Sequence, residues 1–124
     1  MDEDRVYTVD EVNEMLPELA ERLTRVRSAR QALLSGARLV KERVATDGGG
    51  AFGGREYWQA QSTLRVEIER LGRENILLRD PETGLVDFPG EREGRRVWLC
   101  WRLGEERVAH WHELDTGFLG RQPL

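Results

Sequence analysis

Leucine, valine and isoleucine in the first part of the chain recur at alternating intervals of three and four positions, which places them along one face of an α-helix. The first series, with one charged member, comprises Leu16, Leu19, Leu23, Val26, Arg30, Leu33, Ala37, Val40 and Val44. The second comprises Tyr57, Gln61, Leu64, Ile68, Leu71, Asn75 and Leu78. Glycines crowd the segment between the two series, and glycine destabilises a helix interior. The pattern predicts an antiparallel helical hairpin over 8–45 and 55–75, with a flexible Gly-rich loop over 46–54.

The first predicted helix has a defined start. Thr8 and Glu11 match the capping box, in which the hydroxyl and the carboxylate each accept from the other residue's backbone N–H. Tyr7 and Val12 occupy the two positions of a hydrophobic staple, which fixes the angle at which the chain enters the helix. Pro17 lacks an N–H and clashes with the preceding turn. It therefore predicts a short capped N-terminal helix that ends just before it, or a kink in one continuous helix; we adopt the short helix.

Beyond residue 75 the hydrophobic pattern changes to a period of two, which is typical of strands. The segment 80–84 is expected to turn, because Pro81 presets φ and Gly84 tolerates a positive φ. Pro89 and Gly90 are expected to end the strand that follows the turn. The predicted strands are 76–79, 85–88, 95–103 and 107–113, the last two joined through Gly104-Glu105-Glu106. They form a small antiparallel sheet of three or four strands over 76–113.

The length of the loop at 104–106 decides which side chains share a face of the sheet. A two-residue loop mixes the two histidines with Leu99 and Trp101, whereas a three-residue loop sets Leu99 opposite Trp111. We adopt the three-residue loop because it separates apolar from polar residues better. In this register, the apolar face of the sheet, which is expected to meet the helices, comprises Val97, Leu99, Trp101 and Trp111. Its other face comprises Trp98, Cys100, Arg102, Val108, His110 and His112.

Composition narrows the class of protein. A chain of 124 residues suits one domain, 1–124, and 34% charged residues suit a protein in water. No apolar run approaches the roughly 20 residues of a bilayer span, and the acidic start, Met1 to Asp4, is unlike a signal peptide, so we expect a cytoplasmic protein without a membrane partner. Cys100 is the only cysteine, which excludes an intrachain disulfide. A net charge of -4 argues against nucleic acid as the main partner.

Two histidines near the end of the chain form the clearest candidate metal site. Side chains two positions apart on a strand point the same way, so His110 and His112 could chelate one divalent transition metal, with Cys100 across the strand or an acid as the third ligand. A carboxylate ligand could come from Asp87, Glu113 or Asp115. The alternative is that each imidazole is hydrogen-bonded inside the protein, and no His-Glu-x-x-His motif is present. No motif therefore predicts a cofactor, and the metal is a hypothesis.

The same residues also support acid–base chemistry. His112 could exchange a proton with a carboxylate within hydrogen-bond reach, and the candidates are Asp87, Glu113 and Asp115. Cys100 is expected to be a small packed residue rather than a nucleophile, because a reactive thiolate needs a positive and accessible setting.

The C-terminal tail, 114–124, offers a second kind of site. Arg121 in a glycine-flanked turn could bind a carboxylate bidentately, within the protein or on a ligand. Trp98, on the exposed aromatic face of the sheet, is the other ligand-binding candidate. Phe118 and Leu124 are expected to clamp the tail onto the core, with the glycines permitting tight turns.

Four stretches of the chain, YTVDEVNEMLPEL, TGLVDFP, LCWRLGE and WHELDTGFLGR, resemble the bacterial family called domain of unknown function 2203. The resemblance spans nearly the whole chain and implies no particular activity. By resemblance, the family pattern is matched at Gly84, Asp87, Phe88, Pro89, Cys100, Trp101, Trp111, His112, Glu113, Asp115, Gly117, Gly120 and Arg121. His110 is not among these positions, so the resemblance favours His112 as the site histidine. The Gly-rich loop resembles a variable insertion.

The sequence predicts an α+β domain in which the helical hairpin packs on the sheet. Most of the hydrophobic pattern belongs to the two predicted helices, and no set of candidate residues makes up a complete catalytic site. The first hypothesis is therefore a non-catalytic interaction or assembly module that forms a homodimer through its helices or its exposed sheet face, or binds another protein. The alternative is a small metal- or acid–base-dependent enzyme, or a ligand-binding protein, centred on the WHELD segment. Whether the chain is an enzyme stays open.

Overall fold

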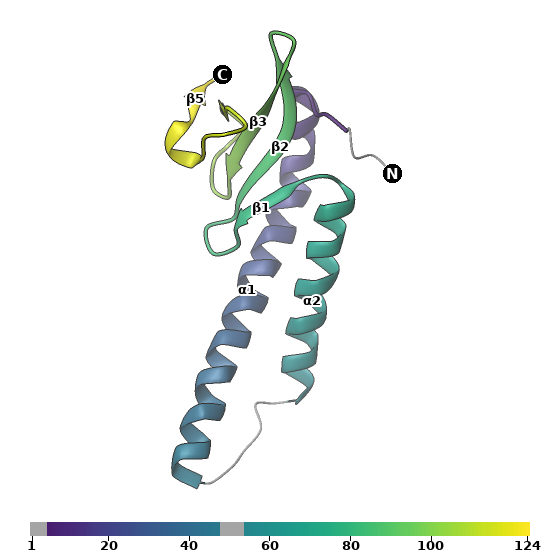
Figure 1. Ribbon diagram of the computed structural model, residues 1–124. Helices are drawn as coiled ribbons and strands as arrows, with labels where there is room; N and C mark the ends of the chain where they lie inside the picture. Colours follow the sequence, from purple (N-terminus) through teal and green to yellow (C-terminus); the bar gives the residue numbers. More distant parts are fainter. Residues whose placement is uncertain (1–4, 48–53) are drawn as a thin grey trace.

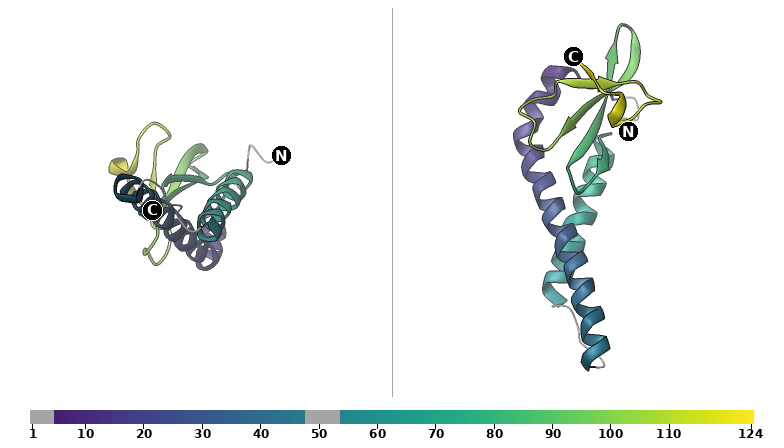
Figure 2. Two further views of the ribbon diagram at one scale, coloured as in Figure 1. Left: turned by 90° about the horizontal axis from the view of Figure 1, so that it is seen from below. Right: turned by 90° about the vertical axis from the view of Figure 1, so that its left-hand side faces the viewer.

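The computed structural model of this chain has an α+β fold, in which two packed helices precede a five-stranded antiparallel sheet (Figure 1). It describes residues 5–47 and 54–124, with side chains for 5–36 and 54–124. The sheet lies beside the N-terminal half of α1, and the far end of the helical hairpin projects away from it (Figures 1 and 2). None of the described helices combines the length and the apolar character that crossing a membrane requires.

The predicted helical hairpin is confirmed. Helix α1 spans Val9–Asp47 and helix α2 spans Gly54–Arg73, so both reach slightly into the segment 46–54 that was expected to be a loop. Residues 48–53 of that expected loop lie outside the described residues, as do the side chains at the end of the first helical series, Ala37, Val40 and Val44.

Five strands pair in chain order, each antiparallel to the next. They are β1 (Leu77–Asp80), β2 (Leu85–Arg92), β3 (Arg95–Arg102), β4 (His110–His112) and β5 (Gln122–Pro123). The sequence predicted three or four strands and missed β5. This strand forms because the tail turns back through a short 3-10 helix, Phe118–Gly120, and pairs with β4, so that the Leu124 N–H donates to the Ala109 carbonyl at 2.9 Å.

The start of α1 is built as the sequence predicted. The Thr8 N–H donates to Glu11 Oε1 at 2.8 Å, and the Glu11 N–H donates to Thr8 Oγ1 at 3.1 Å, which completes the capping box. The staple residues Tyr7 and Val12 are both buried in the core. The Tyr7 ring packs edge-on against Phe88, with 5.4 Å between ring centroids, so the segment before α1 is fastened to the sheet.

Pro17 does not end a helix, so the prediction of a separate short N-terminal helix is wrong. Pro17 is exposed inside the continuous α1. The helix continues because one buried face runs on both sides of the proline, made by Val12, Leu16, Leu19, Leu23 and Val26. Burying each such side chain contributes about 1.5–3 kcal/mol. Together they outweigh the loss of roughly 3 kcal/mol that a proline causes inside a helix.

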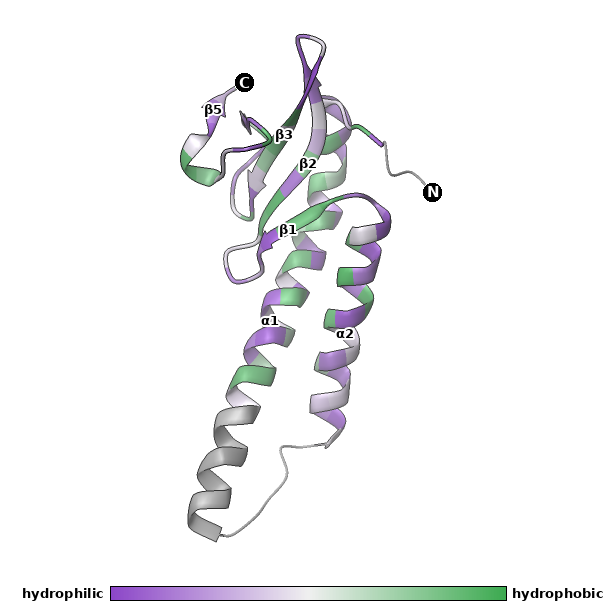
Figure 3. Cartoon of the chain, in the orientation of Figure 1, coloured by the Kyte–Doolittle hydropathy of each residue, from purple (hydrophilic) through white to green (hydrophobic). Residues whose placement is uncertain are grey.

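The core lies between α1, the end of α2 and one face of the sheet, where hydrophobic residues concentrate (Figure 3). Leu99 pairs with Trp111, which confirms the predicted register of β3 and β4. The residues expected on the apolar face, Val97, Leu99, Trp101 and Trp111, are all buried. Val108 was assigned to the opposite face and is instead part of this core. The prediction fails there because β4 begins only at His110, so strand alternation does not govern Val108.

Pro89 and Gly90 do not end the second strand, which corrects that prediction: β2 continues through them to Arg92. The Pro89 carbonyl accepts from the Tyr7 N–H at 2.7 Å, so this edge of Pro89 faces the N-terminal segment and its missing N–H removes no bond to β3. A Cβ atom on Gly90 would lie 2.7 Å from Leu99 Cγ. Glycine therefore leaves the space that Leu99 fills across the sheet.

The second helical series is confirmed only in part: Leu71 is buried in the core as predicted, but other members are exposed. Ile68, a member of that series, is 50% exposed, whereas its neighbour Glu67 is buried. The buried residues of α2 are Ala60, Glu67 and Leu71, so the buried face keeps Leu71 but takes Ala60 and Glu67 in place of Gln61 and Ile68. The ion pair that joins the two helices is formed by Arg22 and Glu67. It does not involve the polar members of the two predicted series, which are Arg30, Gln61 and Asn75.

Arg22 holds the two helices together through two carboxylates. Its Nε lies 2.8 Å from Glu67 Oε1, and its Nη2 lies 2.8 Å from Glu74 Oε1. Glu67 also receives a hydrogen bond from Arg25 Nη2 at 3.3 Å. Burial raises the pKa of the Glu67 carboxyl, but the hydrogen bonds from Arg22 and Arg25 more than offset this, so its pKa is lowered. The carboxylate is thus charged at neutral pH and fixes the register of α1 against α2.

Removing Glu67 should therefore destabilise the hairpin. In the variant Glu67→Ala, the buried Arg22 guanidinium loses one of its two carboxylates, and we expect the free energy of unfolding to fall by about 2–4 kcal/mol. Glu21→Ala, which removes an exposed glutamate of α1, is the matched control and should change it by less than about 0.5 kcal/mol. Urea unfolding followed by circular dichroism measures both, and equal effects of the two variants would contradict this role.

Candidate metal centre

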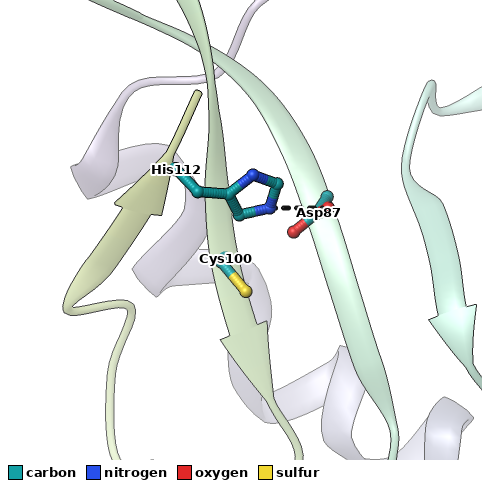
Figure 4. A group of neighbouring side chains, drawn as sticks. All are labelled: Asp87, Cys100 and His112. Carbon is teal, nitrogen blue, oxygen red and sulfur yellow. Dashed lines mark hydrogen bonds and ion pairs between the residues drawn. The ribbon is translucent and has the colours of Figure 1, made fainter. Parts of the chain in front are cut away.

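Three side chains with metal-binding atoms meet on the sheet face that points away from α1. They are Asp87 of β2, Cys100 of β3 and His112 of β4, which are 2%, 1% and 2% exposed (Figure 4). One oxygen, the sulfur and one ring nitrogen from these residues all lie within 4.8 Å of one another. Within the described part of the chain, this is the one group of three or more His, Cys, Asp and Glu side chains that lie close enough to share an ion.

Strand register brings the three residues together. Asp87 lies directly opposite Cys100 in the β2–β3 pair, so their side chains share a face. His112 lies opposite Trp98, two positions along β3 from Cys100, and therefore on the same face as well. The imidazole reaches diagonally across β3 to the carboxylate of Asp87, as Figure 4 shows. A shift of one residue in either pairing would turn one of the groups to the core face.

Both ring nitrogens of His112 face oxygen atoms. Nδ1 lies 2.9 Å from the Glu113 carbonyl oxygen, which can only accept, so Nδ1 carries a proton and donates it. Nε2 lies 3.0 Å from Asp87 Oδ2. A nitrogen lone pair facing a carboxylate oxygen is repulsive unless a proton or a metal cation lies between them. The contact therefore needs a proton, on either side chain, or a bound cation between the two atoms.

The carboxylate of Asp87 is unevenly satisfied. Its Oδ2 accepts from Arg79 Nε at 2.8 Å in addition to its contact with His112. Its Oδ1 is buried and has no hydrogen-bond partner among the described residues. An unpaired buried acceptor costs about 1–3 kcal/mol, and more when it is charged. A bound water molecule or a cation would satisfy such an atom.

The thiol of Cys100 is not activated in this state. Burial raises its pKa to about 12, the negative charge of Asp87 and a hydrogen bond from the thiol to that carboxylate add to the effect, and the Arg121 guanidinium only partly opposes it. Cys100 is therefore a neutral thiol at physiological pH, in agreement with the expectation that it is not a free nucleophile. A bound metal cation would reverse this, because coordination deprotonates a thiol outright.

A cavity of about 370 Å³ lies over the three residues, and the C-terminal tail forms its opposite wall. The tail residues that line it are Leu114, Asp115, Thr116, Gly117 and Phe118. Arg79 and Leu85 complete the lining from the β1–β2 hairpin. The cavity thus joins the candidate metal centre to the WHELD segment singled out from the sequence.

Other residues proposed from the sequence lie elsewhere. The His110 ring is not part of the group, because its Nδ1 lies 3.0 Å from Arg121 Nη2. Arg121 also binds both carboxylate oxygens of Glu105 at 2.9 Å, so its carboxylate partner is inside the protein. Glu113 pairs with Arg95 at the surface and contributes its backbone carbonyl to the site. Asp115 lines the cavity and is exposed.

The remaining proposals concern the tail and Trp98. Trp98 is half-buried, with the Arg79 guanidinium 5.2 Å from its ring centroid. Phe118 and Leu124 are 37% and 42% exposed, so they bury less than the expected clamp would. Arg121 holds the tail in place more directly. It binds the Glu105 carboxylate, and its guanidinium carbon lies 4.7 Å from the ring centroid of Phe118.

Arg79 is the functional residue that the sequence analysis missed. Its position in β1 should place it by simple alternation, but the β1–β2 register shifts between Leu78 and Asp80. Such a bulge redirects the side chain of the residue inside it. The sequence did contain one signal for Arg79. It is a basic residue directly before the predicted turn, in a strand expected to pair with the strand that carries Asp87.

The raised pKa of Cys100 makes a prediction about its reactivity. The metal-free folded protein should react with a thiol reagent such as iodoacetamide only slowly at neutral and mildly alkaline pH, because thiolate becomes abundant only near pH 12. The same protein unfolded in guanidinium chloride, where the pKa returns to about 8.5, should react much faster. Mass spectrometry of the alkylated chain measures the two rates, and fast labelling of the folded protein would contradict the assignment.

Comparison with known proteins identifies a family. The family model described as "Uncharacterized conserved protein (DUF2203)" matches residues 5–124, a range that contains both helices, the whole sheet and all three residues of the candidate metal centre. No curated protein and no solved structure matches the chain. The preference for His112 over His110 that the resemblance implied agrees with the geometry of the site. The chain belongs to the DUF2203 family.

Proposed function

We propose that this protein binds a divalent transition metal, zinc above all, through Asp87, Cys100 and His112. The observation that carries the proposal is the convergence of three buried donor atoms within 4.8 Å of one another. Carboxylate, thiolate and imidazole are the ligand types that zinc takes in proteins. This is the metal-dependent alternative formulated from the sequence, with Asp87 in place of His110.

The surroundings of His112 suit a metal ligand. Metal-binding histidines generally donate their second ring N–H to a carbonyl or carboxylate, which fixes the tautomer and orients the other nitrogen. The Glu113 carbonyl provides that contact at 2.9 Å from Nδ1 and leaves Nε2 to face the other two ligands. A cation bound there takes the place of the proton that the contact between Nε2 and Asp87 otherwise needs.

A divalent cation would also balance the charges of the site. Two negative ligands, the Asp87 carboxylate and the Cys100 thiolate, offset its two positive charges. The buried Oδ1 of Asp87, which lacks a partner among the described residues, supplies a further coordinating atom. Zinc commonly has four ligands at structural sites and three protein ligands at catalytic sites. Three protein ligands beneath a cavity therefore favour a site that binds or converts a ligand over a purely structural one.

Titration with zinc or cobalt tests the proposal. The purified full chain without a histidine tag should bind one equivalent, and binding should release the thiol proton. Cys100→Ser and His112→Ala each remove one direct ligand. We expect each to weaken binding by at least about 100-fold, because loss of a supporting residue alone costs 10–100-fold. Isothermal calorimetry, together with the thiolate-to-cobalt absorption band, provides the readout.

His110→Ala is the matched control, since His110 lies two residues away on the same strand and outside the group. It should bind metal as the unchanged protein does. Circular dichroism establishes that every variant is folded. Binding of less than a tenth of an equivalent by the folded unchanged protein would refute the proposal, as would an equal loss in His110→Ala and His112→Ala.

We also propose that the hairpin mediates self-association, as the first hypothesis from the sequence held. The support is the phase of α2: the apolar side that includes Ile68 is not covered by α1. It borders an apolar groove of about 530 Å³ lined by Arg30, Leu64, Ile68, Leu71, Gly72, Ile76, Leu77, Leu78 and Pro81. In an antiparallel pair of α2 helices, the exposed Arg65 and Glu69 beside this surface would approach the opposite charges of the second copy.

A charge placed on this surface should prevent association. Ile68→Glu is expected to give a monomer by multi-angle light scattering at concentrations where the unchanged protein is a dimer, because a buried unpaired carboxylate is strongly unfavourable. Val66→Glu is the matched control, a similarly exposed apolar residue that does not line the groove. A strictly monomeric unchanged protein at high concentration would exclude the dimer.

A further inference from the structure

We infer that the metal centre is a receptor for a small organic anion, whose carboxylate or phosphate oxygen occupies the open coordination position and pairs with Arg79. The inference rests on the metal site proposed above and names the ligand that this site takes. Three features of the cavity carry it: the position of the donor atoms, the hydrogen bonding of Arg79 and the composition of the wall.

The donor atoms leave one side of the metal position open. Asp87, Cys100 and His112 come from three adjacent strands and lie on one face of the sheet, so they would coordinate an ion from the sheet side. The cavity of about 370 Å³ lies on the other side, toward the tail. This volume is at the small end of the range of roughly 300–1,000 Å³ found for ligand pockets. A fourth ligand would therefore enter from the cavity.

Arg79 is positioned to bind the same ligand. Its Nε donates to Asp87 Oδ2 at 2.8 Å, which fixes the guanidinium beside a metal ligand. The structure gives its two terminal nitrogens no hydrogen bond or ion pair with any described residue, and the side chain lines the cavity. A guanidinium presents paired N–H groups that match the two oxygens of a carboxylate or phosphate. Arg79 thus offers a second contact to an anion held by the metal.

The charges around the position favour a negative ligand. A divalent ion, the Asp87 carboxylate and the Cys100 thiolate sum to zero, and Arg79 adds one positive charge. Asp115 is the other acidic residue that lines the cavity besides Asp87, and it is exposed. The Arg79 side chain is also 44% exposed, so water and salt screen both residues, but the bond to Asp87 holds the Arg79 guanidinium beside the ion position. An anion bound between the metal and Arg79 would neutralise the remaining charge.

The wall of the cavity indicates that the anion carries a short apolar part. Leu85, Leu114 and Phe118 line the cavity together with the polar Thr116. Apolar lining with a few placed polar groups is typical of sites for small organic molecules. Organic acids with a short carbon chain and organic phosphates share the required chemistry, and inorganic phosphate lacks the apolar part.

The test uses the full chain loaded with cobalt, whose visible absorption changes when its coordination changes. Acetate, butyrate and inorganic phosphate are titrated separately. We expect a saturable spectral change, with butyrate binding more tightly than acetate because its longer chain meets the apolar wall. A stronger response to inorganic phosphate than to butyrate would assign the site to inorganic phosphate and overturn the choice of an organic anion.

Arg79→Gln removes the proposed second contact. It should weaken anion binding by about tenfold or more, the equivalent of one charge-assisted hydrogen bond. Arg96→Gln, an exposed arginine of the same sheet that does not line the cavity, is the matched control and should bind anions as before. Cobalt affinity is measured separately for each variant, so that a change in anion binding is not confused with a change in metal binding.

The two proposals fail in different ways. If cobalt binds through its thiolate band but no anion changes the spectrum, the metal site stands and the anion inference is overturned. If Arg79→Gln binds cobalt and anions as the unchanged protein does, the role of Arg79 is overturned. If the folded protein binds no cobalt, both proposals are refuted together.

Discussion

The contact between Asp87 and His112 is the interaction on which the rest of the site depends. It joins β2 to β4 across β3, and both side chains are almost completely buried. A buried charge is very unfavourable unless it is paired, and the Asp87 carboxylate faces both His112 and the Arg79 guanidinium. The facing atoms of Asp87 and His112 further require a cation or a proton between them. Strand register places Cys100 beside this contact, and the bond from Arg79 Nε to Asp87 brings a guanidinium to the same point of the sheet.

The sheet separates two tasks by its alternation. One face packs against α1 and the end of α2, and it contributes apolar residues such as Phe88 and Trp101 to the core. The other face carries the candidate metal centre, and residues of the C-terminal tail line the cavity over it. Arg121 fastens that tail to the sheet through Glu105, so the tail is attached by an ion pair and β5. Stability therefore comes mainly from one face, and chemistry can occupy the other.

Features set by neighbouring residues could be predicted from the sequence, and features set by distant residues could not. The capping box at Thr8 and the register that pairs Leu99 with Trp111 were predicted, because local hydrogen bonding and polarity determine them. Asp87, Cys100 and His112 were all named as candidates, although their common meeting point was not. Pro17 and Pro89 misled the prediction, because packing on both sides of Pro17 and the orientation of Pro89 toward Tyr7 appear only in the folded chain. The buried ion pair of Arg22 and Glu67 was not predicted for a similar reason, because a helical pattern built on apolar positions does not include charged residues.

The central claim is that Asp87, Cys100 and His112 bind one transition metal. X-ray absorption at the zinc edge, on protein loaded with one equivalent of zinc, tests it most directly. The account predicts one sulfur neighbour at about 2.3 Å together with nitrogen and oxygen neighbours at about 2.0–2.2 Å. A first shell of oxygen and nitrogen alone, in protein whose Cys100 is intact and reduced, would contradict it.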